Sequence, residues 1–94
     1  MNTLIASQVL EILRGENPPL LIHVLPPEHF DTFHIHGALN VCSYETSFVE
    51  NIKTLAPNTS TPIIVYGQGD TSSDSQDAAD KLAESGYTNI FDFR

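Results

Sequence analysis

The stretch that decides the fold is Pro62-Ile63-Ile64-Val65-Tyr66-Gly67, an apolar run with no charged residue in it. A short, continuous run of this kind is typical of a strand that is buried on both faces of a parallel sheet. A polar segment, Gln68–Ser75, follows directly and leads into a helical pattern. In open α/β sheets, ligands bind beyond the carboxyl ends of such strands, so we expect any chemistry at this loop.

Outward from this run, short apolar stretches alternate with helical patterns along the chain. The other predicted strands are Thr3–Ile5, Leu20–Leu25, Leu39–Val41 and Asn89–Phe93. Helical spacing covers 28–33 and 44–55, the segment after Ser7 as N-cap up to Gly15, and the segment from Asp74 to Gly86. This alternation predicts a three-layer α/β/α domain with a mainly parallel central sheet of four to five strands.

Length, charge and cysteine usage narrow the class of protein. The 94 residues suffice for one small domain, 1–94, and the net charge is −8. Because no basic patch is present, we expect neither nucleic acid nor a membrane surface as a partner. A single cysteine, no signal-peptide pattern and no apolar run near membrane-spanning length predict a cytoplasmic domain.

Two segments together resemble the rhodanese-like domain family. Leu21–Phe30 followed by His34–Val41 is similar to the family pattern L-I-D-V-R-x-P-x-E-F … G-H-I-P-G-A-I-N-I. The apolar run 62–67, with the helix and strand after it, is similar to P-I-V-V-Y-C … R-S-x-x-A-A-x-x-L-x-x-x-G-F-x-N-V. The match covers nearly the whole chain in the same order, and it implies a rhodanese-like α/β fold.

The departures from the family pattern lie at its active site. The resemblance implies a sulfur-carrying cysteine at the end of the central strand, where this chain has Gly67, and a loop arginine where it has Asp74. The Asp and Arg of the family's D-V-R are replaced by His23 and Leu25. Glycine cannot carry a covalent intermediate, and a carboxylate repels anionic substrates. The degenerate loop comprises Gly67, Gln68, Gly69, Asp70, Thr71, Ser72, Ser73 and Asp74.

The only thiol is Cys42, which follows a predicted strand and so could lie on the same rim of the sheet. One interpretation is a relocated sulfur carrier, and the other is a small, partly buried core residue. The residues after it, Ser43, Tyr44 and Glu45, include no cation that would activate a thiol. The core interpretation is therefore favoured.

Neither the histidines nor the aspartates have the spacing of a metal site. The resemblance implies a structural role for His34, and His23 on a buried strand is expected to be a hydrogen-bonded core residue. The pair His34 and His36 lacks further ligands at suitable spacing, and Asp70, Asp74 and Asp77 do not match a calcium loop. Gly67-Gln68-Gly69 lacks the lysine of a phosphate loop. We expect no metal and no cofactor.

The end of the chain raises a separate expectation. The resemblance implies that a Gly-Gly pair and a Trp-bearing helix would follow Arg94, so the domain is either truncated before the closing helix or a short variant. Phe91 and Phe93 lie on one face of the last predicted strand. Without a covering helix, they would form an exposed surface for a partner or for self-association.

The sequence thus favours a catalytically inactive rhodanese-like domain that binds or regulates a protein partner. The alternative is sulfurtransferase activity that uses Cys42 or handles sulfur non-covalently. A phosphate or arsenate enzyme of the same fold is a third candidate, which is weakened because it needs the missing loop cysteine.

Overall fold

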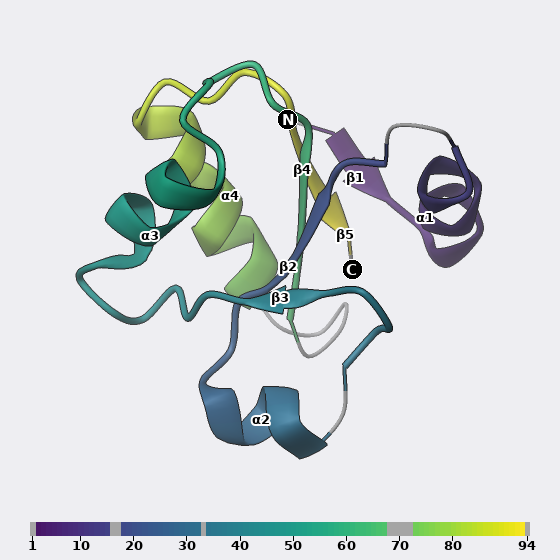
Figure 1. The fold of residues 1–94 in the computed structure, drawn as a ribbon, viewed down its shortest axis with the longest axis horizontal. Helices are drawn as coiled ribbons and strands as arrows, with labels where there is room; N and C mark the ends of the chain where they lie inside the picture. The colour runs from purple at the N-terminus through teal and green to yellow at the C-terminus, as the bar shows by residue number, and fades with distance from the viewer. Residues whose placement is uncertain (1, 16–17, 33, 68–72, 94) are drawn as a thin grey trace.

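Five parallel strands form one sheet in the residues that the structure describes, 2–15, 18–32, 34–67 and 73–93 of a computed structural model (Figure 1). The strands are β1 (Asn2–Leu4), β2 (Leu20–His23), β3 (Leu39–Asn40), β4 (Ile63–Tyr66) and β5 (Ile90–Phe93). Their order across the sheet is β1-β5-β4-β2-β3, and every pairing is parallel. The predicted α/β class and parallel sheet are confirmed. The strand β4 lies in the centre of the sheet, as its continuous apolar sequence predicted, and all four of its residues are buried.

Helices cover both faces of this sheet. They are α1 (Ala6–Leu13), α2 (Pro27–Thr32), α3 (Phe48–Leu55) and α4 (Asp74–Glu84). Figure 1 shows α3 and α4 on one side of the sheet, α1 on the other, and α2 beyond the carboxyl end of β2. This is the three-layer arrangement that right-handed crossovers between parallel strands produce.

The larger part of the core lies between the sheet and the helices α3 and α4. Ile22, Ile63 and Val65 point to this face and are fully buried. Ile52 of α3 and Leu82 of α4 pack against them and are equally inaccessible to solvent. Each such side chain contributes about 1.5–3 kcal/mol through burial, so this layer provides most of the stability.

The other face has a smaller core, built around α1. Val9 of α1 packs with Leu21 and Ile64 of the sheet, and these three side chains are buried. Phe91 and Phe93 belong to this face and are partly buried. The expectation that these phenylalanines form an exposed surface is therefore wrong, because they pack into the layer that α1 covers.

Several helix boundaries differ from the sequence prediction. Ser7 is not the N-cap of α1; Ile5 is, and its N–H donates to Oε1 of Gln8 (2.9 Å). The third helix begins at Phe48 rather than at Tyr44, because the intervening residues form turns. The predicted stop at Gly86 is confirmed, since this residue has a φ of 99° and follows the C-cap of α4.

None of the helices in the described part of the chain is both long and apolar enough to cross a membrane. The longest, α4, has 11 residues. A bilayer-spanning helix needs about 20.

Candidate functional site

The candidate site lies at the carboxyl end of β4, where the sequence predicted it. Gly67 follows this strand directly, and Ser73 and Asp74 begin α4. The predicted loop residues Gln68, Gly69, Asp70, Thr71 and Ser72 lie outside the described residues. The geometry of the site is therefore given by its two ends, Gly67 and Asp74, and by the segments that pack on them.

The side chain of Asp74 lies directly over Gly67. A Cβ atom placed on Gly67 would stand 3.0 Å from the Cβ of Asp74 and 3.7 Å from its Oδ2. It would also stand 3.7 Å from Cγ2 of Val24, which is ordinary contact. The position above the end of the central strand is therefore filled by a carboxylate side chain of the protein itself.

Asp74 is held in this place from the opposite side by Tyr44. The hydroxyl group of Tyr44 donates a hydrogen bond to Oδ1 of Asp74, across 30 positions of sequence. This hydrogen bond, followed by burial and by the charges of Asp74 and Asp77, raises the pKa of Tyr44 above its ordinary value. Asp74 and Asp77 both lie in the first turn of α4, where the helix dipole favours negative charge.

Sequence reasoning gave Tyr44 no role at this site. Its ring is 63% exposed, and it comes from a segment that follows β3, far from the loop in sequence. No local pattern links this tyrosine to Asp74, because the contact depends on how two crossover connections meet at the edge of the sheet. The structure thus adds Tyr44 to the candidate site.

Cys42 lies in the same segment as Tyr44, two residues before it. The thiol is free, and its residue is buried with 8% of its surface exposed. The ammonium group of Lys81 on α4 donates a hydrogen bond to the backbone oxygen of Ser43 (2.5 Å). A cation that the local sequence does not reveal is therefore fixed close to the chain at Cys42, and it serves to hold this segment on α4.

The histidines are distributed over separate environments. Nδ1 of His34 donates to the backbone oxygen of Phe30 (2.7 Å), and the His34 ring stacks on that of Phe30, whereas His36 is exposed. His23 is buried, as predicted, but its Nδ1 has no hydrogen-bond partner among the described residues. Within the ranges that the structure describes, no three His, Cys, Asp or Glu side chains come together as metal ligands would.

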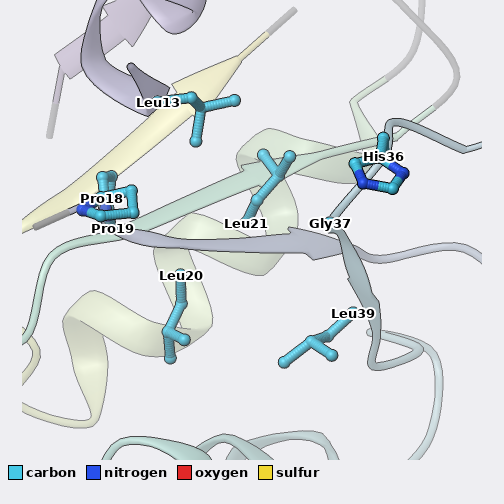
Figure 2. Close-up of a pocket in the computed structure, with 8 residues that line it drawn as sticks. All are labelled: Leu13, Pro18, Pro19, Leu20, Leu21, His36, Gly37 and Leu39. Atoms are coloured by element: carbon cyan, nitrogen blue, oxygen red, sulfur yellow. The ribbon is translucent and has the colours of Figure 1, made fainter. Parts of the chain in front are cut away.

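A cavity lies away from the loop, beside the start of β2. Its volume is about 350 Å³, and Figure 2 shows it between the end of α1, the first residues of β2 and the turn before β3. The lining residues are Leu13, Pro18, Pro19, Leu20, Leu21, His36, Gly37 and Leu39. The lining is apolar except for one imidazole, so the cavity has the character of a binding surface rather than of a catalytic site.

Comparison with known proteins agrees with this architecture. The sequence model of the rhodanese-like domain matches residues 6–94. The chain therefore belongs to the rhodanese-like domain family, as the sequence patterns indicated. A search of curated proteins found no match.

Solved structures show the same fold in several settings. A structure described as rhodanese with anions from E. coli is 30% identical, with a TM-score of 0.69 over 79% of this chain and 82% of that chain. The Alr3790 protein from Anabaena sp. is 22% identical, with a TM-score of 0.76 over 94% of this chain and 76% of that one. EanB in complex with hercynine is 16% identical, with a TM-score of 0.78 over 99% of this chain. This chain spans only 24% of EanB, so that likeness concerns the fold alone.

Proposed function

We propose that this protein is a catalytically inactive rhodanese-like domain that serves as a protein-binding or regulatory module. The observation that carries the proposal is the packing of Asp74 over Gly67, with 3.0 Å between the Asp74 Cβ and the place of a Cβ on Gly67. The family resemblance implies a sulfur-carrying cysteine at position 67. Here the nucleophile is absent, and a side chain at position 67 would require Asp74 to shift by a few tenths of an ångström.

The charge at this position also opposes the family's chemistry. The family's typical substrates are anions, and the relative from E. coli was solved with anions. At the start of α4 this protein instead presents Asp74 and Asp77, and the protein carries a net charge of −8. Since like charges repel, an oxyanion at this site would be disfavoured by the residues that replace the cysteine and the arginine.

The buried position of Cys42 argues against a relocated sulfur carrier. A thiolate is the reactive form of cysteine, and reactive thiols are partly exposed in electropositive surroundings. Cys42 has only 8% of its surface exposed. Lys81, whose ammonium group lies at the residue next to Cys42, donates to the backbone oxygen of Ser43. We therefore assign Cys42 to the core.

Thiosulfate–cyanide turnover tests the inactive half of the proposal. We expect no turnover by the wild type and by Cys42→Ser, and no added sulfur mass on the wild-type chain after incubation with thiosulfate. A sulfur adduct that disappears in Cys42→Ser would overturn the proposal in favour of the sulfurtransferase alternative. A matched active rhodanese in the same assay shows that the conditions support turnover.

The apolar cavity beside β2 supports the binding half of the proposal. Its lining accommodates an apolar side chain of a partner, and Leu39 at its rim is 41% exposed. Leu55 on α3 is 43% exposed and does not line the cavity, so it provides a matched control. A complex reconstituted from purified proteins should be lost with Leu39→Glu and retained with Leu55→Glu. Equal retention by both variants would contradict binding at this surface.

A further inference from the structure

The inference concerns His23, which occupies the last position of β2. In the sheet register it lies between Tyr66 of β4 and Asn40 of β3, and Phe93 of β5 is the next neighbour in the same row. The residue is 3% exposed, and its Nδ1 has no hydrogen-bond partner among the residues described. A buried imidazole without a partner for its ring nitrogen is stable only in the neutral form.

Aromatic rings surround this imidazole instead of polar groups. The ring of Tyr66 meets it edge-on, with 5.1 Å between centroids and 90° between planes. The ring of Phe30 from α2 also meets it edge-on, at 5.5 Å and 77°. The Phe30 ring in turn stacks on His34, with 3.8 Å between centroids and 10° between planes. Phe30 thus links α2 to His23 and also packs on the smaller core that contains Tyr66.

Few other contacts hold α2 on the sheet. The helix has six residues, Pro27–Thr32, and none of them is buried. Beyond Phe30, its attachment depends on the turn that follows, where the N–H of Ile35 donates to the hydroxyl oxygen of Tyr66 (2.9 Å). Figure 1 shows α2 standing apart from the other helices, beyond the carboxyl end of β2. Because α2 is weakly held, a small loss of contact energy at His23 is enough to detach it from the sheet.

The charges around His23 add to the effect of its burial. Burial lowers the pKa of His23 most, followed by the charges of His34 and His29. The other α2 groups, Glu28 and Asp31, have exposed side chains. The strand neighbours that face His23 are Tyr66 and the uncharged Asn40 and Phe93, while Asp92 lies in the alternate row with Val65, on the opposite face of the sheet.

The sign of the pH dependence follows from this lowered pKa. A released His23 titrates near the ordinary value of about 6.5, whereas the packed His23 binds a proton only at lower pH. The packing of neutral His23 therefore contributes fully to the stability of the closed state above about pH 6.5. This contribution is lost progressively as the pH falls below that value.

We propose that α2 is an acid-released cover: protonation of His23 detaches Phe30 and the Ile35 turn from the sheet and exposes the rings of His23 and Tyr66. The rest of the domain stays folded, because the core on the α3 and α4 face contains no histidine among its buried residues. The device rests on the geometry of α2 and is independent of whether the loop at Gly67 is inactive.

Amide hydrogen exchange on the full chain, read residue by residue with NMR, tests this proposal. Between about pH 7.5 and about pH 5, the protection factor of the Ile35 amide should fall by up to about 30-fold, the factor set by a released imidazole that titrates near 6.5. The amide of Val65 in the central strand should keep its protection. Parallel loss at Ile35 and Val65 would show global unfolding, and no loss at Ile35 would show that the helix stays closed; either result overturns the proposal.

Histidine variants separate His23 from the other imidazoles. His23→Phe keeps an aromatic ring that cannot be charged, so the pH dependence of the Ile35 amide should disappear. His36→Gln is the matched control, since His36 is exposed and makes no ring contact with His23 among the described residues, and it should retain the dependence. Should His23→Phe fail to fold, the wild-type ring signals decide: the titration midpoint of the His23 ring must lie below about pH 6.5, and the Ile35 protection must fall in the range between about pH 6.5 and that midpoint. A His23 ring that titrates at or above about pH 6.5, or a loss of protection outside that range, overturns the proposal.

Discussion

Replacing Gly67 with alanine tests whether Asp74 fills the former nucleophile position. The new Cβ would stand 3.0 Å from the Cβ of Asp74, whereas ordinary contacts of this kind are 3.4–4 Å. The start of α4 must therefore move by several tenths of an ångström to admit a single methyl group. Tyr44 opposes that movement, because its hydroxyl group is bonded to the Asp74 carboxylate.

The expected cost of Gly67→Ala follows from two opposing effects. Overpacking by one methyl group in a filled site costs about 1–3 kcal/mol. Alanine restricts the unfolded chain more than glycine does, which returns about 0.4–1 kcal/mol, and Gly67 has no positive φ that would penalise a side chain. We therefore expect Gly67→Ala to lower the free energy of unfolding by about 1 kcal/mol, or the Tm by about 4–8 °C for a domain of this size.

Two backgrounds at position 74 identify the atom responsible. Asp74→Gly removes the Cβ that the new methyl group meets, so adding Gly67→Ala there should be neutral or slightly stabilising. Asp74→Ala removes the carboxylate but keeps the Cβ, so the cost of Gly67→Ala should persist. Urea unfolding followed by circular dichroism measures each free energy, provided that the m-value is unchanged. An equal effect of Gly67→Ala in both backgrounds would refute the packing of these two Cβ atoms.

Three further predictions test contacts of α3 and α4. Tyr87→Phe should cost about 1–2 kcal/mol in urea unfolding, because it removes the donor to a buried backbone oxygen (2.6 Å) at the end of α3. Lys81→Met should cost about 1 kcal/mol, since it deletes the hydrogen bond to Ser43 while keeping the aliphatic stem, and unchanged stability would contradict that role. Asp74→Ala should lower the pKa of Tyr44 toward its ordinary value, because it removes the hydrogen-bond acceptor. An alkaline titration followed by tyrosine absorbance or by ring NMR signals measures this pKa. A Tyr44 pKa that stays raised would show that burial, not the hydrogen bond, is the main cause.

The fold was predictable because its strands carry their own signature. The run at 62–67 reads as a central strand from its apolar continuity alone, and the structure places it at the centre of the sheet. Gly86 marked the end of α4 because its φ of 99° is one that side chains disfavour. In contrast, Ser7 was the wrong N-cap, because α1 already begins at Ala6, and the side chain of Gln8 accepts from the N–H of the actual N-cap, Ile5.

The candidate site was predictable only in its position and in the residues it lacks. The sequence placed the site after β4 and showed the glycine and the aspartate, because both are read directly against the family pattern. It did not reveal the contact between Gly67 and Asp74 or the bond from Tyr44, since these depend on distances across separate crossovers. It also predicted a hydrogen-bonded His23, whereas the Nδ1 of this residue has no partner among the described residues and its ring packs against Phe30 and Tyr66.

The two main departures from the family pattern, Gly67 and Asp74, are therefore in contact with each other and are best understood as one change in packing. The Cβ of Asp74 lies 3.0 Å from the place of a Cβ on Gly67, so this position of Asp74 is unstrained only with glycine at position 67. The hydroxyl group of Tyr44 donates to the Asp74 carboxylate, so an anionic substrate would have to compete with Asp74 for this donor. A cysteine introduced at position 67 meets the same Cβ contact as alanine and a longer side chain besides. We therefore expect that Gly67→Cys alone does not form a persulfide, and that a persulfide on a cysteine at position 67 also requires a change at Asp74.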